Sequence, residues 1–521
     1  VAWALQRLAV PEEAVWLALE KATVKHAADR FKETDLAMVA WALAKHGRTK
    51  SIALMAMADV ATPRISQFSD SELANLSWAL CRSPSASSPL WAAVDIDAAH
   101  RISRGNMQAD HARRTVWAIA RADSSRTCAA TAAETFLIEA AREAGADELA
   151  NLGQLCSWLP TASTDFVVAL GTRVVTIDLS GLSEDQLAQI AWSFVKLKEK
   201  TRGATRSVTI AKGGRLPVQR ATTERSSFEE SDGLNSRVVS SLGQQVLDCI
   251  GAHIGNGGRM FGPGLVKVLH ALAKGGCSAD VTIAVDGALD QLNLDAESLA
   301  DVVWSAGVLG VHEPRILDKL KGVVFPLLGQ MKPSVFVPTL SGLVRMDLLR
   351  GSLGEACASR ALELLPNLGC DHFGYVCAAL VHGDDSIELA LGEVAKWIAS
   401  NDVLAVRAAS GSIISLTEQE CLTVLVQAFP NCETNVRVLG FELDSVIRFS
   451  GGFLNVEIDG PTHQEETRMR IDRRRDALLR AAGIEVARVN ISGWPMEERA
   501  ARMSEATQKL AETLQSLENG R

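Results

Sequence analysis

A Trp residue set in an apolar helical segment returns at a nearly constant interval along the first part of this chain. The segments 36–43, 73–80 and 187–194 share the form Leu-Ala-x-x-x-Trp. Trp3, Trp41, Trp78 and Trp117 follow one another at steps of 38, 37 and 39 residues. The same register continues, with other residues sometimes in the Trp slot, at Gln154, Trp192, His270, Trp304, Gly342 and Ala378.

Each unit contains one amphipathic segment of helical periodicity and enough chain for a second, antiparallel helix. Such a pair cannot bury its apolar face alone, so successive pairs stack. The sequence therefore predicts a mainly α protein, a helical-pair repeat solenoid of about ten units of roughly 38 residues. We expect the repeats to occupy residues 1–197 and 238–430.

Residues 198–237 interrupt the array and are rich in Ser, Thr, Gly and Arg. Residues 198–225 hold eight Lys or Arg and two Glu, a local net charge of +6. Few large apolar side chains are available there to support packing, so we expect a disordered basic insertion.

Two interpretations of the repeat bear on function. The chain has 11 Trp and 1 Tyr, and the periodic Trp residues favour equivalent buried core positions over a base-stacking platform. Four positions after the Trp slot stands a recurrent cation: Arg7, Lys45, Arg82, Arg121, Lys196 and Lys274, with His382 further on. These cations either complement helix dipoles or form a ladder able to follow a phosphate backbone.

Composition narrows the class of protein. The net charge of −9 counts mildly against a nucleic-acid binder, although it can hide a local basic face. The ten Cys residues include no C-x-x-C pair, which indicates buried thiols in a reducing compartment. No apolar run reaches the roughly 18 residues of a membrane span, so no membrane partner is expected. Because Trp3 already lies inside a repeat, we expect the native chain to begin upstream, with any targeting peptide lost.

After about residue 435 the periodicity changes from helical to alternating. Residues 441–449 and 454–459 read as two strands joined at Gly451-Gly452, and the register set by that turn places Asp444 opposite Asp459, with Glu457 on the same face. A helix over 464–482, a strand over 484–491 and a final helix complete a predicted α/β domain at 436–521. Three consecutive arginines lie on the first of these helices: Arg473, Arg474 and Arg475.

These motifs resemble two known families. The Leu-Ala-x-x-x-Trp-Ala-Leu-x-(Lys/Arg) pattern over residues 1–390 resembles octotricopeptide repeats, which are helical-pair arrays of organellar RNA-binding proteins. The string Glu457-Ile-Asp-Gly-Pro-Thr-His463, with Arg475 to Gly483 and Trp494, resembles a RAP domain. This chain departs from that family at Ile484 and Gly493, where an aromatic residue and Glu are common.

The RAP resemblance implies a fold related to restriction-type endonucleases. Those enzymes place an Asp and a Glu-x-Lys around Mg²⁺. Asp444 and Glu457 match the carboxylates, and Asp459 replaces the Lys, for which His463 or an Arg of the next helix would be the substitute. The candidate catalytic residues are therefore Asp444, Glu457, Asp459 and His463, with the first three as metal ligands. A solvated acidic hairpin is the simpler alternative.

Together the resemblances imply an RNA-binding protein that acts on organellar mRNA or rRNA, in mitochondrion or chloroplast, in processing, stability or rRNA maturation. Its partner would be single-stranded RNA, contacted through Arg7, Lys45, Arg82, Arg121, Lys196, Lys274, Arg473, Arg474 and Arg475, with no cofactor required for binding. Two other functions remain as alternatives to RNA binding alone. One is a Mg²⁺-dependent RNA endonuclease guided by the solenoid, and the other is a protein-binding scaffold with protein partners. The missing Lys favours binding without cleavage.

Overall fold

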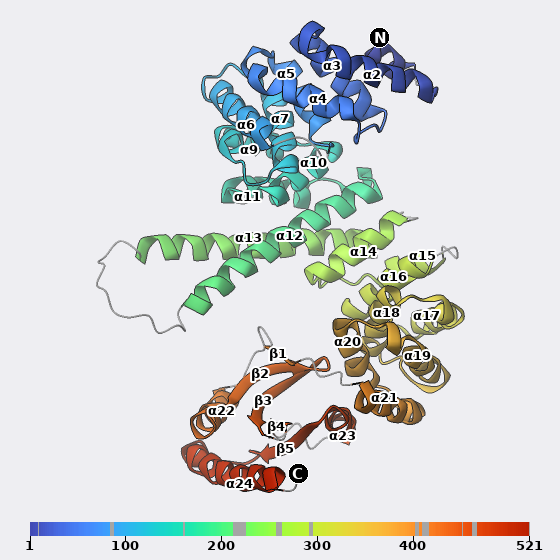
Figure 1. Cartoon of the computed structure of the whole chain (residues 1–521), viewed down its shortest axis with the longest axis vertical. Coiled ribbons are helices and arrows are strands. Elements are labelled where there is room, and N and C mark those ends of the chain that lie inside the picture. The colour runs from blue at the N-terminus through green and yellow to red at the C-terminus, as the bar shows by residue number, and fades with distance from the viewer. Residues whose placement is uncertain are drawn as a thin grey trace. The chain divides into compact units, whose positions relative to one another are not determined.

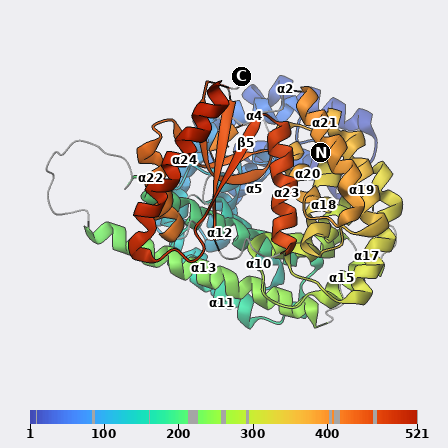
Figure 2. The ribbon, with the colours of Figure 1, turned by 90° about the horizontal axis from the view of Figure 1, so that it is seen from below.

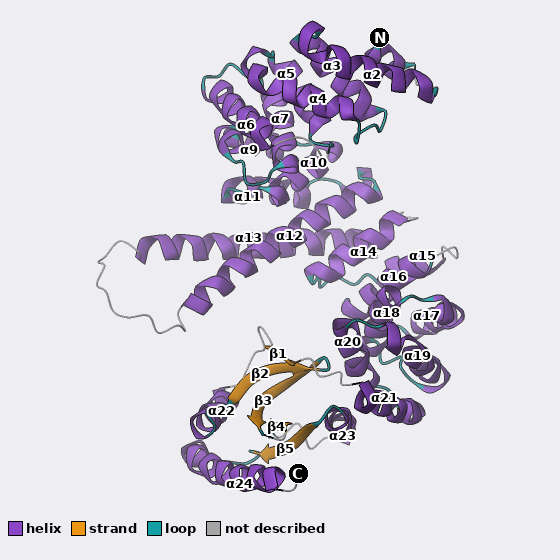
Figure 3. Ribbon diagram, viewed as in Figure 1, coloured by secondary structure: helices purple, strands orange, loops and turns teal. Residues whose placement is uncertain are grey.

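A computed structural model of the chain describes residues 1–8, 10–83, 88–159, 162–211, 226–256, 263–290, 295–401, 406–408, 416–450, 452–460 and 466–519. The fold is mainly helical with a small sheet near the C-terminus, as predicted (Figures 1 and 3). The chain divides into two compact units: Val1–Met260 with Lys274–Ala279, and Phe261–Ala273 with Asp280–Arg521.

In the first unit every predicted repeat segment is helical. The helices that carry the Trp slot are α1 (Ala2–Arg7), α3 (Glu33–Lys45), α5 (Asp70–Leu80), α7 (Ala109–Ala122), α10 (Ala146–Trp158) and α12 (Glu184–Ala211). Between them lie α2 (Glu13–Arg30), α4 (Ile52–Ala61), α6 (Ser88–Ser103), α8 (Cys128–Ala132), α9 (Glu134–Glu143), α11 (Thr164–Thr176) and α13 (Ser226–Gly255). Each helix of the first set packs against the next of that set, from α1 through α12, and the second set packs likewise.

Helix α5 shows why these segments are helical. The Ser69 hydroxyl accepts from the backbone N–H of Glu72, whose carboxylate accepts from the backbone N–H of Ser69, so two free donors at the helix start are satisfied. Leu73, Leu76 and Leu80 are fully buried at spacings of three and four residues. The cap fixes where the helix begins, and the apolar stripe fixes which face it buries.

The second unit begins with the same alternation. Its Trp-slot helices are α14 (Pro263–Gly275), α16 (Ala296–Val308), α18 (Pro333–Arg345) and α20 (Cys370–Leu380), and their partners are α15 (Thr282–Asp290), α17 (Pro314–Leu327), α19 (Gly351–Leu364) and α21 (Glu388–Asn401). Helices α16 and α18 approach closely at Gly307 and Gly342. A Cβ added to Gly342 would overlap the carbonyl group of Val303 and lie 2.9 Å from the Cα of Trp304, so the Trp slot of α18 has no room for a side chain.

The rest of the second unit is an α/β domain with a five-stranded sheet in the order β1-β2-β3-β4-β5. Its strands are β1 (Val406–Ala408), β2 (Cys432–Val438), β3 (Phe441–Phe449), β4 (Gly452–Asp459) and β5 (Ile484–Asn490). Strands β4 and β5 are parallel and the other pairs are antiparallel. The helices are α22 (Leu416–Ala428), α23 (Glu466–Ala481) and α24 (Arg499–Asn519).

Helices cover both faces of this sheet. One face packs on α22 and α24 through Leu425, Ile447, Val456, Met503 and Leu510. Helix α23 lies on the other side, as Figure 2 shows. It ends at Ala481, one residue before the predicted end, and Gly483 follows it with a φ of +78° that suits glycine. No described helix is long and apolar enough to cross a membrane.

Two expected boundaries differ from the structure. Helix α12 continues to Ala211 and α13 begins at Ser226, so those parts of the expected disordered insertion 198–237 are helical, while residues 212–225 lie outside the described residues. Extending a packed helix adds one hydrogen bond per residue without a new nucleation cost. The α/β domain also begins before residue 436, because β1 and β2 join its sheet and α22 contributes to its core.

Candidate nucleic-acid interface

The periodic Trp residues are not core residues, contrary to the sequence prediction. Trp3 is 47% exposed, and Trp41, Trp78, Trp117, Trp192 and Trp304 are half-buried. In α5 the buried stripe is made by the neighbouring Leu and Ala residues, so Trp78 falls at its edge. A helix can pack only one stripe against its neighbours, and smaller residues fill that stripe here.

In the repeats of α3, α5, α7, α10 and α12, three positions lie at the edge of the buried apolar stripe and are partly or fully exposed. They are the Trp slot itself, the residue three before it and the cation four after it, which a helical period places on one face. We call this surface of α3, α5, α7, α10 and α12 the Trp face. It consists of Met38, Trp41, Lys45, Asn75, Trp78, Arg82, Arg114, Trp117, Arg121, Asn151, Gln154, Trp158, Gln189, Trp192 and Lys196.

Indole rings and guanidinium groups alternate across three neighbouring helices of the Trp face. Arg82 Cζ lies 3.6 Å from the ring centroid of Trp78 and 5.3 Å from that of Trp117. Arg121 Cζ lies 5.6 Å from the Trp117 centroid and 5.7 Å from that of Trp158. Cation–π attraction favours these contacts. The tryptophans therefore help to position Arg82 and Arg121 at the protein surface.

The α10 unit shows how the stack continues where the Trp slot holds another residue. Gln154 occupies the slot, and Trp158 occupies the position of the cation. The rings of Trp117 and Trp158 are 5.5 Å apart and tilted by 57°. Trp158 was not among the residues predicted from the sequence, although its place four residues after the slot was a usable signal.

The ladder cations lie at the surface as the repeat spacing suggested. Arg7, Lys45, Arg121, Lys196 and Lys274 are exposed and Arg82 is half-buried. Burial lowers the pKa of the Arg82 guanidinium, and the neighbouring charge of Arg121 lowers it further. An arginine remains charged in spite of this shift, so the two cations repel each other. An anion placed near both would relieve that repulsion.

A pocket of about 390 Å³ opens on the Trp face between α5, α7 and α10. Trp78, Arg82 and Trp117 form one part of its wall, and Arg114 and Asn151 another. The remaining polar lining comes from Asp110, Arg113, Asp147 and Glu148. This volume is in the range of small-molecule sites.

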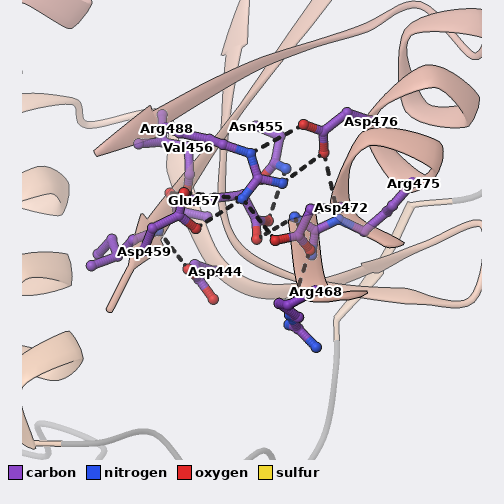
Figure 4. Close-up of polar contacts among 12 residues, drawn as sticks. Asp444, Asn455, Val456, Glu457, Asp459, Arg468, Asp472, Arg475, Asp476 and Arg488 are labelled. Carbon is purple, nitrogen blue, oxygen red and sulfur yellow. Dashed lines mark hydrogen bonds and ion pairs between the residues drawn. The ribbon is translucent and has the colours of Figure 1, made fainter. Parts of the chain in front are cut away.

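The predicted catalytic carboxylates in the C-terminal domain form a different kind of cluster. Glu457 and Asp459 of β4 each pair with an arginine, Arg475 of α23 and Arg488 of β5 respectively (Figure 4). Arg475 Nη2 lies 2.8 Å from Glu457 Oε2, and Arg488 Nη1 lies 2.8 Å from Asp459 Oδ1. Arg488 also binds Asp476 at 2.9 Å. Burial alone would lower the pKa of Arg488, but hydrogen bonds to Asp476 and Asp459 raise it above its usual value.

The hairpin register differs from the prediction by two residues. Phe449 pairs with Gly452 and Ser445 with Val456, so the strands turn one residue earlier than a Gly451-Gly452 turn requires. A shift of two keeps each side chain on its face, which is why the alternation could not reveal it. Asp444 is not opposite Asp459. Its carboxylate accepts from the backbone N–H of Ile458 at 2.7 Å.

These contacts bear on metal binding. Among the described parts of the chain, no group of three or more His, Cys, Asp or Glu side chains is arranged to hold a metal ion. His463, the candidate replacement for Lys, lies outside the described residues. The geometry is therefore that of a buried ion-pair network whose carboxylates already have arginine partners.

The three consecutive arginines of α23 that were expected to bind RNA lie in different environments. Arg473 is exposed, but Arg474 and Arg475 are buried, so the expectation is wrong for those two. Arg474 donates to the backbone carbonyls of Val381, Gly383 and Asp384. It also pairs with Glu388, at 2.5 Å. Arg474 thus fastens α23 to the helical part of the same unit and is not available to a phosphate.

Neither a scan of protein-family models nor a search of curated proteins returned a match for this chain. The chemistry of the two clusters therefore rests on their geometry. The Trp face presents aromatic rings and cations to solvent, whereas the C-terminal network satisfies its charges internally.

Proposed function

We propose that this chain binds single-stranded RNA along the Trp face. The observation that carries the proposal is the surface stack Trp78–Arg82–Trp117–Arg121–Trp158. Aromatic rings and guanidinium planes stack on unpaired bases of any sequence, and cations beside them neutralise phosphates. Half-exposed rings that alternate with guanidinium groups therefore suit both the bases and the phosphates of a single strand.

The finer architecture belongs to the same proposal. The alternating packing of helices supports an octotricopeptide-like solenoid, in which each helical pair is one repeat. The order of strands and helices after residue 430 supports a RAP-type domain of restriction-endonuclease-like fold. By that resemblance the RNA is an organellar mRNA or rRNA, and the protein acts in mitochondrion or chloroplast on its processing, stability or maturation.

Charge supports RNA over a protein partner for the Trp face. The whole chain is acidic, yet a cation recurs four residues after the Trp slot, and these residues are exposed or half-buried: Arg7, Lys45, Arg82, Arg121, Lys196 and Lys274. A scaffold for proteins would need an apolar patch or charges suited to one partner. Cations that recur at one position of successive repeats, with Trp158 in that position of α10, suit a polymer with regularly spaced phosphates.

The first experiment removes the aromatic rings of the stack while keeping apolar side chains at their positions. The variant Trp78→Leu with Trp117→Leu is titrated into a fluorescein-labelled single-stranded RNA of mixed sequence, and anisotropy gives the Kd. Because base stacking on an aromatic residue is worth about 1–3 kcal/mol, we expect the Kd to rise at least tenfold. The control is Phe325→Leu, which removes a 49% exposed aromatic ring from α17. Unchanged affinity in a folded Trp variant would contradict the proposal.

A second experiment tests the endonuclease alternative. The protein is incubated with a bound RNA and Mg²⁺ or Mn²⁺. The arginine partners of Glu457 and Asp459 lead us to expect no cleavage. Metal-dependent cleavage that Asp444→Ala abolishes would instead make the chain an RNA endonuclease that the repeats direct.

A further inference from the structure

The pocket on the Trp face has the composition of a site for one nucleobase. Its ionisable lining consists of three arginines, Arg82, Arg113 and Arg114, and three carboxylates, Asp110, Asp147 and Glu148. These charges balance, so the pocket suits a neutral ligand with donors and acceptors on its edges better than it suits a phosphate. The wall that Trp78, Arg82 and Trp117 form offers a planar ligand faces on which to stack.

The contacts among these residues determine which of their hydrogen-bond donors and acceptors remain for a base. Arg113 binds Asp110 and Glu148, so these three largely satisfy one another. Arg114 donates one N–H to the side-chain oxygen of Asn75, at 2.8 Å. A guanidinium has five N–H donors, so Arg114 retains several. Asp147 accepts from Gln186, and a carboxylate has capacity for further donors.

We propose that this pocket reads guanine and that Arg114 is its specificity-determining residue; the inference rests on the proposed RNA binding. Guanine presents two adjacent acceptors, O6 and N7, which an arginine contacts with two parallel hydrogen bonds. Its other edge presents N–H donors, which a carboxylate such as Asp147 accepts. Adenine lacks the O6 acceptor, and the pyrimidines lack N7, so none of them matches Arg114 in the same way.

The position of Arg114 in the repeat supports a reading role. It stands three residues before Trp117, and the equivalent positions hold Met38, Asn75, Asn151 and Gln189. On α3, α5, α7 and α12 the Trp slot and the cation slot keep the same chemistry, whereas this position holds Met38, Asn75, Arg114 and Gln189. A surface that binds every unit of a strand alike but distinguishes bases needs one constant set of contacts and one variable contact.

The test is selection from a pool of single-stranded RNA with randomised positions, carried out with the full chain and with Arg114→Asn. Asparagine pairs with adenine N6 and N7, so we expect one enriched guanine position to become adenine while the others keep their preference. For two RNAs that differ only there, the ratio of Kd values should change by about tenfold or more. The control is Arg142→Asn, which removes an exposed arginine from α9 and should leave the selected sequence unchanged.

Arg114→Lys provides a second variant with the same charge. Lysine lacks the planar fork, so the guanine preference should fall while the salt dependence of binding stays constant. Two outcomes would overturn the inference, and they are distinguishable. If both variants select the sequence of the parent, Arg114 does not read a base although RNA binding stands. If the parent chain binds no RNA from the pool, the proposed function fails as well.

Discussion

Arginines on two parts of this chain lie in opposite environments. Arg82, just after α5, and Arg121, on α7, lie on tryptophan rings at the surface of the repeats. On α23, Arg474 and Arg475 are buried at 6% and 7% exposure, and carbonyl and carboxylate oxygens surround them. Both groups follow helical spacing in the sequence. Burial decides their roles, because a buried guanidinium must be fully paired within the fold and a surface one keeps donors for a partner.

The two sets of repeats differ in a second way. In the first unit, the rings of Trp117 on α7 and Trp158 on α10 lie 5.5 Å apart at the surface edge. In the second unit, α16 and α18 meet through Gly307 and Gly342, where no side chain fits. The alternating stack of tryptophan and arginine lies on α5, α7 and α10, whereas in the second unit the rings of His270 and Trp304 lie 4.8 Å apart and α16 packs closely on α18. The predictions that follow run from the largest expected effect on stability to the smallest.

Arg474→Met should have the largest effect on stability. It removes the donor for the carbonyls of Val381 and Gly383 and the partner of Glu388. Because several buried charged hydrogen bonds disappear together, we expect the second unit to lose about 3 kcal/mol in a denaturant titration. The control is its exposed neighbour, Arg473→Met, with a change within about 0.5 kcal/mol. Equal midpoints for the two variants would show that Arg474 does not fasten α23.

Gly342→Ala should have an intermediate effect. The added Cβ would overlap the Val303 carbonyl group, so α16 and α18 would have to separate. Overpacking of this kind costs about 1–3 kcal/mol. The matched control is Gly322→Ala in α17, where a Cβ would meet nothing within 4 Å. That change should stabilise the protein by up to about 1 kcal/mol, since alanine favours a helix interior. The two variants should thus shift Tm in opposite directions, and shifts of the same sign would refute the close packing.

Neutralising the ladder should affect stability least and RNA binding most. In the triple variant Arg82→Gln, Arg121→Gln and Lys196→Gln, the stack is weakened but no fully buried ion pair is broken, so we expect at most about 1 kcal/mol of destabilisation. A plot of log K against log salt for single-stranded RNA has a negative slope. That slope should become shallower by about 0.7 for each phosphate that the protein no longer neutralises. A control triple on α9, α17 and α21, Arg142→Gln, Lys321→Gln and Lys396→Gln, should leave the slope unchanged. An unchanged slope in the ladder variant would leave these cations as complements of helix dipoles.

The sequence alone determined the features that depend on local periodicity. The common phase of Trp41, Trp78 and Trp117 predicted helices at α3, α5 and α7, and alternation predicted β3, β4 and β5, because side-chain period and backbone conformation are coupled within a few residues. Strand β2 was missed, since its residues Cys432 to Val438 do not alternate cleanly between apolar and polar.

Only the tertiary structure decided what each side chain contacts. A helical period shows that Trp117 and Arg121 share a face, but the neighbouring helices determine whether that face is buried, and here it stays at the surface. Alternation likewise could not separate two registers that differ by two residues, so the pairing of Ser445 with Val456 came from the folded hairpin. The partners of Glu457 and Asp459 are Arg475 and Arg488, 18 and 29 residues away in the sequence. Contacts of that kind depend on how β4, β5 and α23 pack, because burial and pairing are properties of the assembled elements and not of any one segment.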